Sequence, residues 1–226
     1  MNICFDPRIN SVKELDINIS DSDIEREPMV YGGSAHWTNI NGGPLTKAIL
    51  DAIKDTYEFR MLLESQGIKG YHPVIDTKSV LLMPGWYPCI PGWHCDGVIR
   101  NDRNSQPDTL TISEPIQHYT CYFTGDGEFS PTEFIEDPLV LNVNPEEVWK
   151  SVDLGVKDAL SKGRVSVFAA KPGEIVKFNR STLHRGVLAT RRHWRYFFRL
   201  SFYHMPAMNR FRHQVQVYPK DINGGW

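Results

Sequence analysis

From residue 77 onward, the sequence is a series of short β-forming runs that end at proline, glycine or polar turns. Most of these runs alternate in polarity or are rich in β-branched and aromatic residues, as expected of strands. Many short strands separated by such turns predict a sandwich or barrel rather than a parallel α/β sheet. The predicted strands are Thr77–Met83, Gly92–Ile99, Pro115–Gly125, one or two strands within 131–143, Val165–Ala170, Glu174–Asn179 and Trp194–Met205.

Two segments have helical periodicity instead. The first follows Thr46, which can cap it, and ends at Gly67; the second covers Glu146–Gly163 and also ends at a glycine. We expect both helices to pack on the outside of the β core. The first forty-odd residues show little periodicity and are expected to be extended or loop structure. One face of the first helix is expected to carry Ile49, Ile53, Tyr57, Met61 and Leu62.

The composition favours a globular protein with one domain. The 226 residues are 41% hydrophobic and 23% charged, and no internal repeat or linker is visible. The four cysteines form no Cys-x-x-Cys pair, and neither a signal peptide nor an apolar run of membrane length is present. We therefore expect a single domain over 1–226 that is cytoplasmic, has free thiols and has no membrane partner.

The charge is nearly balanced overall but uneven along the chain. The formal net charge is −2, so the whole molecule is not an obvious polyanion binder. From Lys171 onward the only acids are Glu174 and Asp221, against eleven Lys and Arg residues. A solvated basic face explains this pattern, and the alternative is a site for an anionic substrate or cosubstrate. No recognised nucleic-acid-binding motif accompanies these residues, so we expect no nucleic-acid partner.

The residues that most directly indicate chemistry are His94 and Asp96 in the predicted strand Gly92–Ile99. Residues two apart on a strand point to the same face, so both side chains should enter one cavity while Cys95 points away. His184, just beyond a later strand, can supply a third ligand. Two histidines and one carboxylate form a facial triad that suits ferrous iron and leaves positions open for a cosubstrate and oxygen.

This combination resembles the Fe(II)/2-oxoglutarate-dependent oxygenase superfamily: His94-x-Asp96, then His184 after a Pro-Gly strand turn, then an arginine on the next strand. The phytanoyl-CoA dioxygenase-like and prolyl-hydroxylase-like branches look most similar. The resemblance covers about Thr77–Tyr203 and implies a mainly β, double-stranded β-helix (jelly-roll, cupin-like) core, with an N-terminal extension and helix over 1–76. It implies Fe(II), 2-oxoglutarate and O2 as cofactors. The implied reaction is hydroxylation of a small-molecule or amino-acid-like substrate with release of succinate and CO2; halogenating members have a small residue in place of the aspartate.

In that family a basic residue on the strand after the second histidine binds the distal carboxylate of 2-oxoglutarate. Arg199 and Ser201 resemble the family's Arg-x-Ser motif, in which a guanidinium and a hydroxyl hold the carboxylate together. We therefore rank Arg199 first and Arg195 second, although the interval from the second histidine to Arg199 is longer than the commonest spacing. Tyr119 is a further candidate for a hydrogen bond to the cosubstrate, although a buried core tyrosine is the more common outcome.

Two other functions fit parts of the pattern. The same three ligands could hold zinc in a redox-inert, cupin-type isomerase or hydrolase, which would not need a buried arginine on the last strand. A non-catalytic binding module on the same barrel would tolerate the loss of a ligand, whereas all three ligands are present here. Trp86, Trp93 and Trp194 are expected to pack in the core, with stacking on a flat substrate as the alternative.

Overall fold

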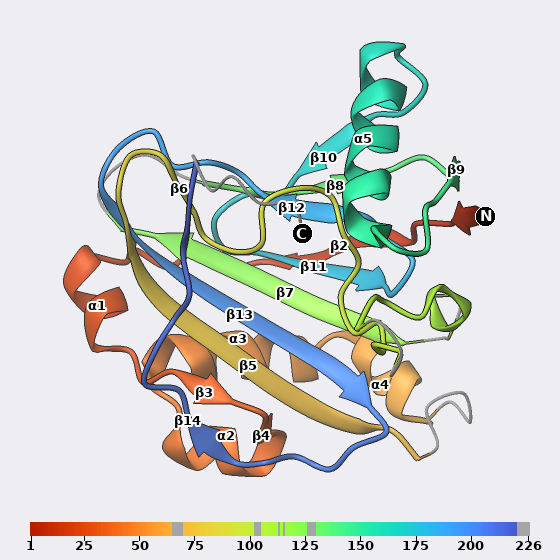
Figure 1. The fold of residues 1–226 in the computed structure, drawn as a ribbon. Helices are drawn as coiled ribbons and strands as arrows, with labels where there is room; N and C mark the ends of the chain where they lie inside the picture. The colour runs from red at the N-terminus through yellow and green to blue at the C-terminus, as the bar shows by residue number, and fades with distance from the viewer. Residues whose placement is uncertain (65–69, 102–104, 113, 115, 126–129, 221–226) are drawn as a thin grey trace.

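The computed structural model describes residues 1–64, 70–101, 105–112, 114, 116–125 and 130–220. The architecture is mainly β with antiparallel pairing, and five α-helices lie outside the sheets (Figure 1). The strands are β1 (Asn2–Phe5), β2 (Ile9–Glu14), β3 (Val30–Tyr31), β4 (Gly33–Ser34), β5 (His72–Leu82), β6 (Trp86–Tyr87), β7 (Gln117–Thr124), β8 (Thr132–Ile135), β9 (Leu139–Asn142), β10 (Val167–Ala169), β11 (Glu174–Asn179), β12 (His184–Gly186), β13 (His193–Tyr203), β14 (Arg210–Phe211) and β15 (Tyr218–Pro219). The helices are α1 (Asp21–Arg26), α2 (Ala35–Asn41), α3 (Pro44–Lys54), α4 (Tyr57–Glu64) and α5 (Val148–Ser161).

The largest sheet has six strands in the order β2-β11-β7-β13-β5-β4. Its central strand β13 pairs with β5 along its full length, from His193 opposite Leu82 to Tyr203 opposite His72. The other edge of β13 pairs with β7. Because successive side chains of a strand point to opposite faces, β13 contributes to both faces of this sheet.

A three-stranded sheet, β10-β8-β12, packs on one face of the large sheet. Phe134 of β8 contacts Phe178 of β11, with ring centroids 5.2 Å apart, inside an apolar cluster that joins the two sheets. The segment 131–143 forms two short strands, β8 and β9, as the sequence predicted. Helix α5 lies over this end of the molecule and buries Val152 in a cluster with Leu141 of β9 (Figure 1).

The opposite face of the large sheet is covered by the N-terminal helices (Figure 1). The predicted first helix is two helices, α3 and α4, because the chain breaks its helical pattern at Asp55 and Thr56. The break turns Tyr57 and Met61 outward, where they are 72% and 45% exposed, so the predicted apolar face is wrong at these two positions, whereas Leu62 packs against the core. The predicted end of the helix at Gly67 lies outside the described residues.

Thr46 does not cap the first helix. Gly43 is the N-cap and Pro44 the first helical residue, a position where the missing N–H of proline has no intrahelical partner to lose. The Thr46 hydroxyl instead donates to the buried Glu27 carboxylate at 2.6 Å and lies 2.7 Å from the Tyr196 hydroxyl of β13. This contact fixes α3 on the large sheet.

The first forty residues contain more regular structure than the sequence indicated. Strand β1 pairs with β9, and β2 adds an edge to the large sheet beside β11. Helix α1 begins with a capping box in which Ser20 and Asp23 bond each other's backbone amides. The partners of β1 and β2 lie in the second half of the chain, so local periodicity could not reveal these strands.

After β13 the chain returns across the face of the large sheet that points away from the N-terminal helices. On the way β14 pairs with β3, and β15 pairs with β6. This return segment, 204–220, lines the same cavity as β13 with three of its side chains. None of the helices in the described part of the chain combines the length and apolar character that a bilayer span requires.

Candidate metal centre

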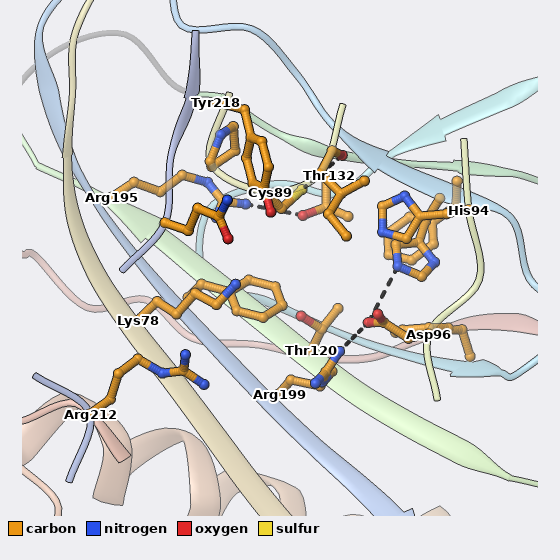
Figure 2. Close-up of a pocket in the computed structure, with 17 residues that line it drawn as sticks. Lys78, Cys89, His94, Asp96, Thr120, Thr132, Arg195, Arg199, Arg212 and Tyr218 are labelled. Carbon is orange, nitrogen blue, oxygen red and sulfur yellow. Dashed lines mark hydrogen bonds and ion pairs between the residues drawn. The ribbon is translucent and has the colours of Figure 1, made fainter. Parts of the chain in front are cut away.

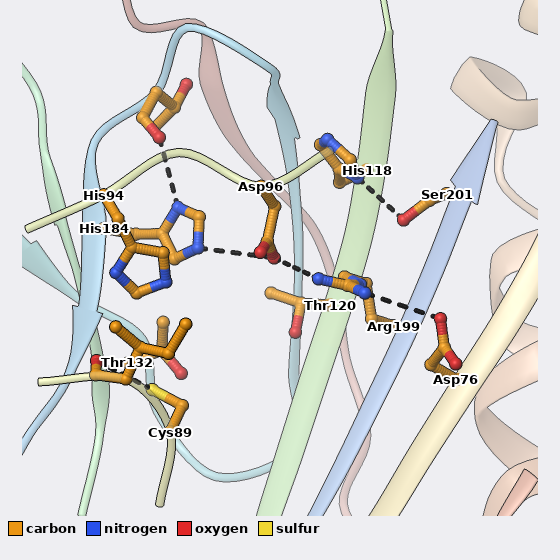
Figure 3. A network of polar contacts seen from close by, with 12 residues as sticks. Asp76, Cys89, His94, Asp96, His118, Thr120, Thr132, His184, Arg199 and Ser201 are labelled. Atoms are coloured by element: carbon orange, nitrogen blue, oxygen red, sulfur yellow. Dashed lines mark hydrogen bonds and ion pairs between the residues drawn. The ribbon is translucent and has the colours of Figure 1, made fainter. Parts of the chain in front are cut away.

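The predicted strand Gly92–Ile99 is reduced to a single β-bridge, in which His94 pairs with His184. The His94 amide donates to the His184 carbonyl at 3.1 Å, and the His184 amide donates to the His94 carbonyl at 2.9 Å. Side-chain alternation survives without a regular strand, because Trp93 and Cys95 are buried in the apolar cluster under α5. The two imidazoles therefore enter one cavity, with centroids 4.7 Å apart (Figure 3).

Each imidazole is oriented by a backbone carbonyl. His94 Nδ1 lies 3.0 Å from the Gly92 carbonyl, and His184 Nδ1 lies 3.1 Å from the Thr182 carbonyl. A carbonyl only accepts, so each Nδ1 must carry a proton, and in the neutral ring this leaves the lone pair of Nε2 for a metal ion. Hydrogen bonds of this kind, from the ring nitrogen that does not face the ion, fix the orientation of histidine ligands of metal ions.

Asp96 completes the group. Ligand atoms of His94, Asp96 and His184 all lie within 4.8 Å of one another, and His184 Nε2 is 3.4 Å from Asp96 Oδ2. The chain turns away at Gly97, whose φ of +72° favours glycine. A Cβ at this position would also lie 3.3 Å from the His118 ring.

The protonation states suit a cation. Burial, together with the neighbouring His184, lowers the pKa of His94 to about 4, so this imidazole is neutral at pH 7. Burial opposes ionisation of Asp96, but the Arg199 guanidinium and the two imidazoles outweigh it and hold the pKa of this carboxyl well below its usual value. Two imidazoles and one carboxylate are a donor set that ferrous iron, zinc and other first-row divalent ions accept.

Arg199, the first-ranked residue for 2-oxoglutarate, is paired with two carboxylates (Figure 3). Its Nη1 donates to Asp96 Oδ2 in a short hydrogen bond, and its Nη2 lies 3.4 Å from Asp76 Oδ2. Asp76 also lies 3.4 Å from Arg212 of the return segment. Arg199 therefore orients the candidate metal ligand Asp96 in this structure.

Arg195, the second-ranked residue, lies at the other end of the cavity, which has a volume of about 220 Å³ (Figure 2). Its guanidinium is buried and stacks over the Tyr122 ring at 4.7 Å. Nε donates to the Ser130 carbonyl at 2.9 Å, and Nη2 donates to the Thr132 hydroxyl at 3.0 Å. These two hydrogen bonds fix the plane of the guanidinium and use neither proton of Nη1. Arg195 has no carboxylate partner among the described residues, so its positive charge faces the cavity uncompensated.

Ser201 and Tyr119 do not line this cavity. The Ser201 hydroxyl is buried 2.7 Å from Nδ1 of His118. Tyr119 lies on the opposite face of β7, where its ring packs edge-on against Phe59 of α4 in the helix-covered core. The predicted contact of Tyr119 with the cosubstrate is therefore wrong, because Thr120, not Tyr119, points from β7 into the cavity.

The three tryptophans pack in the core, as the sequence favoured. Trp93 is fully buried, and Trp86 and Trp194 pack against separate apolar clusters. None of the three lines the cavity around the candidate metal ligands. Strand β13 alternates as a regular strand does, because Arg195, Phe197 and Arg199 all line that cavity.

Sequence reasoning missed four residues of the site: Asp76, Lys78, Thr132 and Arg212. Lys78 forms no hydrogen bond or ion pair within the described residues, and burial lowers its pKa. It lies opposite Phe197 in the β5–β13 register, between Arg195 and Arg212 (Figure 2). Lys78 is the one charged residue of the predicted strand Thr77–Met83, and this was the feature of the sequence that could have indicated its place in the site.

No family model and no curated protein matches the chain. Several solved structures are similar at low identity. An N-substituted L-amino acid dioxygenase from Burkholderia ambifaria AMMD, in complex with alpha-KG, is 12% identical with a TM-score of 0.32, over 84% of this chain and 78% of that one. A non-heme monooxygenase, the ThoJ–Ni complex, is 7% identical with a TM-score of 0.34, over 93% and 75%. EvdMO1 is 16% identical with a TM-score of 0.32, over 66% of this chain and only 33% of EvdMO1. Because all three TM-scores are below 0.5, only the residues of the site itself can indicate a function.

Proposed function

We propose that this protein is an Fe(II)- and 2-oxoglutarate-dependent oxygenase that hydroxylates a C–H bond and releases succinate and CO2. One observation carries the proposal: a convergent group of two imidazoles and a carboxylate shares a cavity with the buried guanidinium of Arg195. A redox-inert metal site would need the two imidazoles and the carboxylate but not the buried guanidinium. The two stacked antiparallel sheets fit a jelly-roll core within one domain.

His94, Asp96 and His184 would hold the ferrous ion, through Nε2 of each histidine and one carboxylate oxygen. When bound, the ion supplies oxygen activation coupled to oxidative decarboxylation of 2-oxoglutarate. The protein's own contribution is orientation. The two backbone carbonyls hold the imidazole tautomers, and Arg199 holds the carboxylate from its far side.

We propose Arg195, rather than Arg199, as the anchor for the distal carboxylate of 2-oxoglutarate. Arg199 is compensated by two carboxylates, so a third carboxylate there would be repelled by Asp96 and Asp76. Arg195 has no such compensation, and the Thr132 hydroxyl beside it can add a hydrogen bond. The buried guanidinium also has a desolvation cost that a bound carboxylate would offset.

Phe134 and Phe178 line the cavity that contains the candidate metal ligands and Arg195. Each ring lies within 6 Å of the His184 ring, at centroid distances of 5.8 Å and 5.2 Å. They restrict water near the ligands, which strengthens the polar contacts made to a bound diacid.

The test is anaerobic addition of 2-oxoglutarate to the Fe(II)-loaded protein. We expect a visible charge-transfer absorption when the keto acid chelates the ion, and slow succinate formation after oxygen is admitted. Zinc-loaded protein is the spectroscopic control, because zinc gives no such band. Fe(II) binding without the band and without succinate would contradict the oxygenase assignment and favour a redox-inert enzyme.

A further inference from the structure

A second cavity, of about 450 Å³, adjoins the cavity that contains the candidate metal ligands. The two cavities share Lys78, Phe197, Arg199 and Arg212, which form the wall between them. His94, Asp96 and His184 line only the first cavity, whereas Gly97, directly after Asp96, lines the second. A molecule in the second cavity would therefore lie next to the candidate metal centre.

The rim of the second cavity is apolar and exposed. Ile99, Met205 and Met208 are 54%, 73% and 48% exposed, and all three line it together with Tyr31 and Tyr203. Large apolar side chains are rarely gathered on a surface without a binding role. Methionine is also suited to ligands of varied shape, because its unbranched side chain adapts its rotamers.

The lining of the two cavities together carries more positive than negative charge. Lys78, Arg195, Arg199 and Arg212 line one cavity or both, against the carboxylates of Asp76 and Asp96. Arg180, which also lines the second cavity, is compensated by Glu114 at 2.7 Å. A divalent cation and a dianionic cosubstrate would cancel one another, so two of these four positive charges would still lack counter-charges.

Lys78 and Arg212 are best placed to supply those two charges. Lys78 has no hydrogen bond or ion pair within the described residues, and Arg212 shares its one carboxylate, Asp76, with Arg199. The Arg212 guanidinium stacks over Tyr31 at 4.7 Å, which holds it at the junction of the two cavities. An anionic group there would compensate both cations at the edge of the apolar rim.

We propose that the second cavity is the substrate site and that the substrate class is an organic acid with an apolar body. The apolar body lies against Ile99, Met205 and Met208, and the carboxylate lies between Lys78 and Arg212. That this ligand is a substrate rests on the proposed oxygenase function. Its chemical class does not, so binding of such an acid can be tested without turnover.

The test is isothermal titration calorimetry on the metal-free protein with four probes: octanoate, octanamide, octylammonium and acetate. We expect octanoate to bind at least ten-fold more tightly than octanamide, which lacks the charge, and than acetate, which lacks the apolar body. Octylammonium should not bind measurably. Equal affinity for octanoate and octanamide, or no octanoate binding, would overturn the proposal.

Two substitutions locate the site. Met205→Glu adds a negative charge at an exposed position of the rim and should weaken octanoate binding at least ten-fold, whereas Leu110→Glu, also exposed but away from the cavity, should not. Arg212→Met should weaken octanoate but not octanamide, and Arg210→Met, an exposed arginine on the same segment, is its matched control. If Met205→Glu bound octanoate as tightly as the wild type, the placement in the second cavity would be overturned, and this result would hold even if Arg212→Met failed to fold.

Arg195→Leu separates the two cavities. Octanoate binding should survive this change, because Arg195 lines only the cavity of the candidate metal ligands. Loss of binding in Arg195→Leu would mean that octanoate occupies the cosubstrate position, which overturns the proposal. If the ferrous 2-oxoglutarate complex fails to form and octanoate still binds, the enzyme function fails while the ligand class stands.

Discussion

The two faces of strand β13 have opposite chemistry although they belong to one continuous strand. The face toward the helices carries Tyr196, Phe198, Leu200 and Phe202, each fully buried in an apolar cluster. The other face carries Arg195, Phe197, Arg199, Ser201 and Tyr203, and three of these side chains line the candidate metal cavity. A period of two residues thus separates the residues that stabilise the fold from those proposed to carry function.

The two faces of β13 also contribute with opposite sign to the stability of the fold. On the helix side, apolar burial contributes roughly 1.5–3 kcal/mol for each large side chain. On the cavity side, Arg195 is buried and Lys78 is half-buried, and neither has a carboxylate partner among the described residues. This arrangement is unfavourable until an anion binds. Buried charge of this kind is typical of functional sites that other parts of the fold must stabilise.

The largest expected effect tests the cavity side. His94→Ala or Asp96→Ala should lower succinate formation at least about a thousandfold, equivalent to about 4 kcal/mol, because the cation site loses a ligand. The folded structure should survive, since β13 keeps its helix-side core. Circular dichroism and Fe(II) binding accompany the rate measurement, and Asp51→Ala, at an exposed acid of α3, is the control. Turnover at the wild-type rate in either variant would refute the proposed ligand set.

On the helix side, Phe198→Ala should lower the free energy of unfolding by about 3–5 kcal/mol, because it leaves a cavity in the core. The affinity for 2-oxoglutarate of the protein that remains folded should be unchanged, because the ring points away from the site. Urea denaturation measures the first quantity and titration of the charge-transfer band the second. A large change in cosubstrate affinity would mean that the two faces are coupled.

Within the cavity side, Arg195→Leu should raise the 2-oxoglutarate KM roughly a hundredfold, equivalent to about 2.7 kcal/mol, through loss of a buried charge-assisted contact. Arg199→Leu should lower Fe(II) affinity and kcat more than it raises this KM, because Arg199 contacts Asp96. Arg192→Leu, an exposed arginine beside β13, is the control. A larger KM effect at Arg199 than at Arg195 would restore the ranking made from the sequence.

A smaller effect concerns pH. Burial lowers the pKa of His94 to about 4 and that of His118 to about 3, from 6.5 in the unfolded chain. Below pH 6.5 the unfolded state therefore binds protons that the folded state does not, and the stability of the metal-free protein should fall as the pH drops. Each histidine contributes on the order of 2 kcal/mol between pH 6.5 and pH 5. Urea denaturation at both pH values should show this loss, and the loss should be smaller in His118→Gln.

The sequence predicted those parts of the fold whose pattern is local. Helix α5 and strands β7, β11 and β13 lie within a few residues of their predicted ranges. His94 and Asp96 share a side of the chain because side-chain alternation holds even at an isolated bridge. The N-terminal strands were not predicted, since their partners lie in the second half of the chain.

The choice between Arg195 and Arg199 could not be made from the sequence. Both lie on the same face of β13, so their own spacing does not distinguish them. The two arginines differ in their neighbours across the strands. In the register of β5 and β13, Asp76 lies directly opposite Arg199, whereas Val80 lies opposite Arg195. Arg195 instead donates to the neutral hydroxyl of Thr132. The same register brings in Lys78, which no motif indicated.

The reciprocal backbone bonds between His94 and His184 have a consequence for metal selection. Since the polypeptide holds both imidazoles in position by itself, the geometry of the site does not have to be formed by the ion. Emptying the site with a chelator should then be reversible without denaturation, and ions of similar size should exchange on one rigid scaffold. Cellular supply, together with the general affinity order of divalent metals, would decide which ion the protein carries.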